Sequence, residues 1–111
     1  MHSNIQLVAL FPYMHSLHTA IDNLASATTY DEATKLKEEV LRLGHRRGDQ
    51  ELLAALAEAY PNAVSHSARR ALLWMLELRS PTHQAFRQTE AALIGKIPLP
   101  KDLQPPRLKY A

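Results

Sequence analysis

Cysteine is absent from this 111-residue chain, so disulfide bonds, thiolate-ligated metals and a cysteine nucleophile are all excluded. Because small secreted domains often depend on disulfides, we expect the protein to be cytoplasmic. Glycine occurs only three times, and the sequence holds no phosphate-binding loop, dinucleotide fingerprint or nucleophile elbow. Since the zinc-protease motif is missing as well, the sequence favours a protein that is not an enzyme and uses no metal or cofactor.

Long apolar runs and a strong charge excess are also missing. No stretch approaches the roughly 18 continuous apolar residues that span a membrane, so we expect no membrane association. No basic residue precedes the apolar part of the N-terminus and Pro12 interrupts it, which is not typical of a signal peptide. The formal charge is +2, and the excess lies in residues 95–111, where four of the 13 Lys and Arg residues accompany a single acid. Such a basic tail can contact acidic surfaces or aid solubility.

What is present predicts an all-α fold. Apolar residues make up 46% of the chain, which is enough for one hydrophobic core. Their spacing indicates a single small bundle of about five helices within residues 12–95. The expected helices cover about residues 13–27, 29–44, 49–60, 65–79 and 80–95. An apolar arm, residues 5–11, precedes the bundle, and an extended, Pro-rich basic tail, residues 96–111, follows it.

Local signals predict where these helices begin and end. Thr29 and Glu32 fit a capping box at the start of the second helix, and Gly44 is expected to end that helix in the left-handed conformation. Asp49 is the expected N-cap of the third helix, and Pro61 is expected to end it. The fifth helix is expected to start with Ser80 as its N-cap and Pro81 at its first position.

The fourth helix is the expected core element. Its segment ALLWMLEL, residues 71–78, is apolar on nearly every side, which is typical of a central helix or of one covered by a second subunit. These side chains cannot all face one interior direction. We therefore expect at least one apolar face to be left over, and a homodimer would cover it.

This surplus of apolar surface favours an interaction protein, because large apolar patches outside a core usually mark interfaces. By size and helix pattern, the chain is like bacterial anti-activators and adaptors. We therefore expect a non-enzymatic regulatory or adaptor protein that binds another protein, for example as an inhibitor of a transcription regulator. The residues expected to contact the partner are Phe11, Tyr13, Leu17, Trp74 and Leu78, with Arg69 and Arg70 at the rim.

DNA binding is the alternative. Residues 51–78 follow a helix, short turn, helix pattern that resembles a bacterial helix-turn-helix. The resemblance implies a transcriptional regulator that contacts DNA through the start of the 65–79 helix, with Ser65, His66, Ser67, Arg69 and Arg70. Pro61 and Asn62 replace the usual glycine of the turn. The near-neutral helical body is also a poor electrostatic footprint for DNA, so protein binding remains the leading hypothesis.

Two further patterns leave alternatives open. His15, His18 and Asp22 share one helix face and could approach a metal, but a fourth ligand is not evident and a solvated face is the favoured interpretation. The proline-rich tail could be a ligand for a domain that binds polyproline, or a strap laid along the helices. We favour the strap, anchored by Ile97, Leu99 and Leu103.

Overall fold

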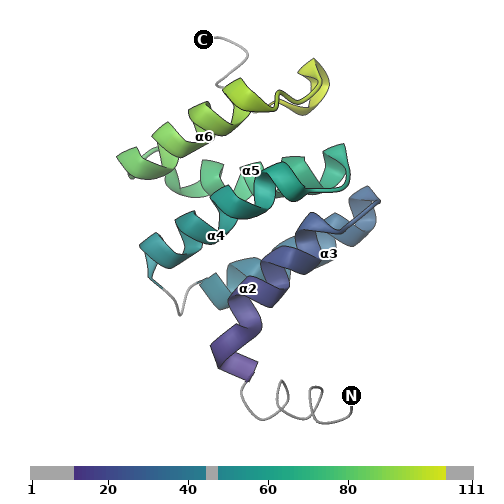
Figure 1. The fold of residues 1–111 in the computed structure, drawn as a ribbon, viewed down its shortest axis with the longest axis vertical. Helices are drawn as coiled ribbons and strands as arrows, with labels where there is room; N and C mark the ends of the chain where they lie inside the picture. The colour runs from purple at the N-terminus through teal and green to yellow at the C-terminus, as the bar shows by residue number, and fades with distance from the viewer. Residues whose placement is uncertain (1–11, 45–47, 105–111) are drawn as a thin grey trace.

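The computed structural model describes residues 12–44 and 48–104, with residues 12–16 as backbone alone. It confirms an all-α fold of five packed helices. These are α2 (Pro12–Ala25), α3 (Tyr30–Gly44), α4 (Asp49–Asn62), α5 (His66–Arg79) and α6 (Gln84–Lys96), followed by the short 3-10 turn η1 (Lys101–Leu103). From α2 to α6 the helices succeed one another along the long axis of the molecule (Figure 1). Within the described ranges, no helix combines the length and the apolar character that crossing a membrane requires.

The helices form two layers. The first layer contains α2, α4 and α6, in which α4 packs against both of the others. The second layer contains α3 and α5, which pack against each other. Helix α5 also contacts α2, α4 and α6, so it touches every other helix of the bundle. This confirms that the fourth expected helix is the central element of the fold.

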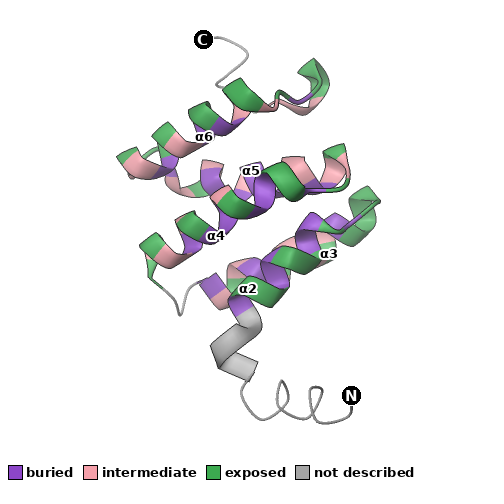
Figure 2. Cartoon of the chain, in the orientation of Figure 1, coloured by how far each residue is buried: buried purple, intermediate pink, exposed green. Residues whose placement is uncertain are grey.

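The core is built around α5. Six of its residues are buried: Ala68, Ala71, Leu72, Leu73, Met75 and Leu76. Figure 2 shows this helix with buried positions along most of its length. Trp74 is only half-buried and Leu78 keeps 47% of its surface exposed. One apolar face of α5, one turn long, therefore stays outside the core.

Two of the predicted helix starts are formed by side-chain caps. Thr29 Oγ1 accepts a hydrogen bond from the Glu32 amide at 3.1 Å, and Glu32 Oε1 accepts one from the Thr28 amide at 2.9 Å. Ser65 Oγ accepts from the Ala68 amide at 3.0 Å and donates to the Ala27 carbonyl at 2.7 Å. The second cap thus also ties the start of α5 to the segment that follows α2.

Gly44 is the last residue of α3, as predicted, but its φ is not positive, so the expected left-handed conformation is wrong. The predicted boundaries of the third helix are wrong in detail, because Gly48 rather than Asp49 is the N-cap of α4. The helix passes through Pro61 and ends at Asn62. A proline in the last turn removes only one helical hydrogen bond, and the Asn62 side chain donates to the Glu58 carbonyl at 3.1 Å.

The predicted start of the fifth helix is also wrong. Ser80 is the buried C-cap of α5, because its amide donates to the Leu76 carbonyl at 3.1 Å and its hydroxyl to the Glu77 carbonyl at 3.2 Å. Helix α6 begins only at Gln84 and continues past Gly95 to Lys96. A Ser-Pro pair is a good helix start, but here the serine already serves the preceding helix.

The segment after α6 lies against the helices, as the strap interpretation expects. Tyr60 Oη donates to the Ile97 carbonyl at 2.7 Å, and Leu99 is buried with 3% of its surface exposed. Leu103 packs on the core, and the Gln104 side chain donates to the Leu99 carbonyl at 3.1 Å. We call residues 97–104 the strap. The expected arm, residues 5–11, and the end of the tail, residues 105–111, lie outside the described residues.

Candidate functional site

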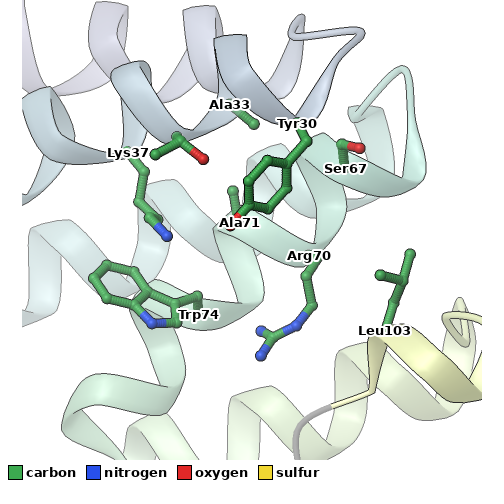
Figure 3. A pocket seen from close by; sticks show the side chains of 9 residues that line it. Tyr30, Ala33, Lys37, Ser67, Arg70, Ala71, Trp74 and Leu103 are labelled. Atoms are coloured by element: carbon green, nitrogen blue, oxygen red, sulfur yellow. The ribbon is translucent and has the colours of Figure 1, made fainter.

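A hollow in the molecular surface lies between α3 and α5. It has a volume of about 320 Å³, at the lower end of the range for ligand pockets. Its lining residues are Tyr30, Ala33, Thr34 and Lys37 of α3, Ser67, Arg70, Ala71 and Trp74 of α5, and Leu103 of η1 (Figure 3). We call this hollow the α3–α5 cavity.

The sequence spacing explains why these residues face one another. On both helices the lining positions follow the pattern i, i+3, i+4, i+7, which places them on one helix face. At the i+3 position of α3 and the i+4 position of α5 stand alanines, Ala33 and Ala71, and both are buried. These short side chains leave space between two helices that are otherwise close, and the cavity occupies that space.

Lys37 and Trp74 form a cation–π contact in the cavity. The Lys37 Nζ atom lies 4.1 Å from the centroid of the indole ring, within the distance at which such contacts are attractive. Figure 3 shows the ammonium group directed at the ring. Over residues 17–44 and 48–104, no carboxylate forms an ion pair with Lys37. The lysine charge is therefore held in place by the ring while it remains without a counterion there.

Arg70 supplies the second positive charge. Its Nη2 atom lies 3.5 Å from Glu77 Oε1, and the two side chains keep only 25% and 21% of their surface exposed. The Arg70 Nη1 and Glu77 Oε2 atoms are buried and have no hydrogen-bond partner in the described part of the chain. The guanidinium thus has donor capacity that its single ion pair does not use. None of the nine lining residues is acidic, and the two cations of the cavity are Lys37, which has no counterion there, and Arg70, which is paired with Glu77 beside the cavity.

A second hollow continues along the same side of α5. It has a volume of about 200 Å³ and is lined by Leu41, Met75, Leu78 and Arg79. Leu41 of α3 and Leu78 of α5 come one turn after Lys37 and Trp74, so the two helices run parallel. We call the two hollows together the α3–α5 groove. Trp74 and the exposed Leu78 form an apolar stripe that connects them.

The structure brings together part of the predicted protein-contact set. Trp74, Leu78 and Arg70 belong to the groove. Leu17 is 2% exposed and packs in the core, where a partner would not reach it. Phe11 lies outside the described residues, and Tyr13 lies in α2 as backbone alone. The α5 part of the predicted surface is therefore the part that the structure places at a groove.

The candidate DNA contacts do not share one open surface. Ser65 is occupied as the cap of α5. Arg69 donates from Nε to the Tyr60 carbonyl at 3.2 Å and from Nη2 to the Ala63 carbonyl at 2.9 Å, so it holds the turn between α4 and α5. His66 is exposed, whereas Ser67 and Arg70 line the α3–α5 cavity. Arg69 was also expected at the rim of the protein interface, and it lies inside this turn instead.

Tyr60 links this turn to the strap. Its side chain is fully buried, and burial raises the pKa of the phenol above its usual value of 10.0, while the Arg69 cation lowers the pKa by a smaller amount. The guanidinium carbon of Arg69 lies 5.9 Å from the centroid of the tyrosine ring. The neutral phenol that results is the form that donates to the Ile97 carbonyl.

A second cluster of charges joins three helices near the start of α4. Asp49 lies 3.1 Å from Arg79 and 3.7 Å from His83, which belong to the end of α5 and the N-cap of α6. His18 lies 4.0 Å from Glu51. Among the side chains that the structure describes, no three His, Asp or Glu residues are placed to hold a metal ion. The side chain of His15, one member of the candidate triad, is outside that set.

Sequence reasoning did not assign six of the nine lining residues to a site: Tyr30, Lys37, Ala33, Thr34, Ala71 and Leu103. A usable signal existed for the first two, because they stand seven residues apart and so share a face of α3. That face lies beside the buried stripe of the helix. The position of Leu103 follows from the path of the strap, which local sequence does not specify.

No protein family, curated protein or solved structure matches the chain.

Proposed function

We propose that the protein is a non-enzymatic adaptor or regulator that binds a segment of another protein in the α3–α5 groove. The observation that carries this proposal is the apolar stripe of Trp74 and Leu78, which lies between two hollows on a helix whose other apolar side chains are buried. A half-buried tryptophan and an exposed leucine one turn apart on the central helix leave apolar surface in water, which costs stability. A binding role accounts for that cost.

The chemistry of the groove supports a protein partner. Tryptophan, tyrosine and arginine are enriched among the residues that dominate protein–protein binding, and the cavity contains one of each. Two parallel helices with a hollow between them also present the shape into which the apolar face of a third helix docks. A protein of this kind acts by occupying a surface, as an anti-activator does on a transcription regulator.

Capture of partners from the source cells tests the proposal. The bait is the full chain, compared with the variants Trp74→Ala and Leu78→Asp. Val64→Asp is the matched control, because Val64 is 60% exposed and lies outside the groove. We expect a protein that the wild type and the control retain and that both groove variants lose. Equal retention by all four baits would show that binding occurs elsewhere.

The alternative occupant of the groove is a second copy of the chain, because the sequence favours a homodimer. Sedimentation equilibrium at micromolar concentration separates the two cases. With a foreign partner we expect the isolated protein to stay monomeric and its groove to stay open. A dimer that Leu78→Asp dissociates and Val64→Asp does not would assign the groove to self-association and overturn the proposal.

A further inference from the structure

We propose that the occupant of the α3–α5 groove is an acidic amphipathic helix, which places its apolar side chains on the Trp74–Leu78 stripe and a carboxylate on Lys37 and Arg70. This inference rests on the proposed function and specifies the chemistry of the partner. It depends on the charge of the cavity wall, on the unused donors of Arg70 and on the arrangement of the two hollows.

The charge of the cavity favours an anionic group. Lys37 and Arg70 are its only charged lining residues, and both are cations. Bringing a third cation between them would be repulsive. A carboxylate would be attracted, and more strongly than at an open surface, because the cavity is partly enclosed and the effective dielectric constant there is lower.

Arg70 is prepared for a second acceptor. Glu77 engages one side of the guanidinium, and this ion pair limits the positions that the long side chain can occupy. The Nη1 atom is buried and has no acceptor in the described part of the chain, so a carboxylate would meet Arg70 through the part of its side chain that lines the cavity. An arginine has five N–H donors, and carboxylates accept from them in charge-assisted hydrogen bonds that are stronger than neutral ones.

Lys37 is prepared in a different way. The indole ring of Trp74 attracts its ammonium group to one position, so less side-chain entropy remains to be lost on binding. An apolar side chain on Trp74 would then lie next to a fixed positive charge. A partner that combines an apolar anchor with a neighbouring acid satisfies both features at once.

The two hollows indicate that the acid is carried by a helix. Trp74 and Leu78 are four residues apart, so the hollows that they border follow each other at about 6 Å along the helix axis. Side chains at positions i and i+4 of a bound helix have the same spacing. The tail of this chain does not have the required charge, because residues 105–111 contain Arg107 and Lys109 and no acid.

Selection from a phage-displayed library of helical peptides tests the inference with a defined probe. The wild-type protein is the target, and the Leu78→Asp variant removes peptides that bind outside the groove. We expect enriched peptides to carry an apolar i, i+4 pair with Asp or Glu within one turn of it. Enrichment of neutral or basic peptides would overturn the charge inference and leave the proposed function standing. No enrichment over the variant would overturn both.

Calorimetric titration with a synthetic copy of an enriched peptide then locates the carboxylate. Replacing the Asp or Glu of the peptide by Asn or Gln is expected to weaken binding about tenfold, because a charge-assisted hydrogen bond is lost. The same loss of affinity is expected from Lys37→Gln. When the peptide and the protein are both changed, the loss of binding free energy should be smaller than the sum of the two separate losses. Lys35→Gln is the matched control, because it removes the same charge from an exposed position of α3 outside the cavity.

The role of Arg70 is tested with a variant that does not leave its ion-pair partner, Glu77, without a cation. Arg70→Gln alone would leave the partly buried Glu77 without its cation, so Arg70→Gln with Glu77→Gln is the informative protein. We expect this double variant to fold and to bind the amide form of the peptide as the wild type does. We expect it to lose the preference for the peptide that carries the carboxylate. Unchanged preference for the acid in both the Lys37 variant and this pair would overturn the inference.

Discussion

At the scale of single residues, a few hydrogen bonds from buried or partly buried side chains decide how separate segments are joined. Tyr60 of α4 reaches across to the strap, and Ser65 joins the start of α5 to the carbonyl of Ala27. Each bond links residues that are far apart in the sequence. Because a buried polar group without a partner is costly, these side chains specify which segments lie together as well as adding stability.

Replacing Tyr60 by phenylalanine tests the link to the strap. The Ile97 carbonyl would lose its donor, and we expect the free energy of unfolding at pH 7 to fall by about 1 kcal/mol, measured by urea denaturation. Tyr30→Phe is the control, because Tyr30 is 73% exposed and removing its hydroxyl should leave the free energy of unfolding nearly unchanged. A decrease of the same size in both variants would contradict a specific role for the Tyr60 hydroxyl.

The raised pKa of Tyr60 adds a dependence on pH. A phenol whose folded pKa exceeds its unfolded value of about 10.0 contributes stability that is complete below that value and is lost as the pH rises through the folded pKa. Between pH 10 and the folded pKa, wild-type stability should therefore decline more steeply than that of Tyr60→Phe. Parallel declines of the two proteins would show that another group controls the alkaline limit.

At the scale of secondary-structure elements, α5 serves both the core and the groove. Its buried residues contact every other helix, and the remaining apolar face carries Trp74 and Leu78. The apolar pattern of residues 71–78 was sufficient to predict a central helix with a face left over. The same pattern contains no information about which neighbour would leave that face uncovered.

Substitutions of two leucines of α5 distinguish its role in the core from its role in the groove. Leu72→Ala creates a cavity in the core, and we expect the free energy of unfolding to fall by about 2–5 kcal/mol. Leu78→Ala removes an exposed side chain, and the expected change is within about 0.5 kcal/mol. Thermal and chemical denaturation measure both. A loss at Leu78 as large as that at Leu72 would mean that Leu78 belongs to the core rather than to a binding surface.

The ends of the helices were predicted correctly where the cap depends on neighbouring residues. They were predicted wrongly where the expected capping residue has a role elsewhere in the fold. The capping box of Thr29 and Glu32 depends on neighbours within four residues, so the sequence was enough. The cap formed by Ser65 is equally local, although only the approximate start of that helix was predicted. Ser80 looks like the start of a helix, yet it is buried and ends the one before. For the groove, the α5 side was predicted, whereas Lys37 was not, because the facing of α3 and α5 is a tertiary property.

At the scale of the whole molecule, the strap connects the end of the chain to both layers. Tyr60 holds it at Ile97, Leu99 is buried, and Leu103 forms part of the cavity wall. The strap has one short turn of its own and few backbone hydrogen bonds, which are features of segments that open more readily than helices. The shape of the groove therefore depends on a segment less stable than the helices.

Leu99→Ala tests this dependence. We expect amide hydrogen exchange in residues 97–104 to accelerate by at least about tenfold, because the strap loses its buried anchor, while exchange in α5 changes much less. Hydrogen exchange measured by mass spectrometry resolves the two regions, and Lys101→Ala at an exposed position is the control. Equal acceleration in α5 would show that strap and bundle open as one cooperative unit.

Trp74 is the only tryptophan of the chain. Its indole lines the α3–α5 cavity, one turn of α5 before Leu78 of the second hollow, and the Lys37 ammonium lies over the ring. When the protein is excited at wavelengths that its four tyrosines do not absorb, its fluorescence therefore comes from this ring alone. A ligand free of tryptophan that contacts the ring or displaces the ammonium would change the intensity and the wavelength of that emission. The molecule has a built-in optical probe of occupancy, and groove filling can be followed in the unlabelled protein.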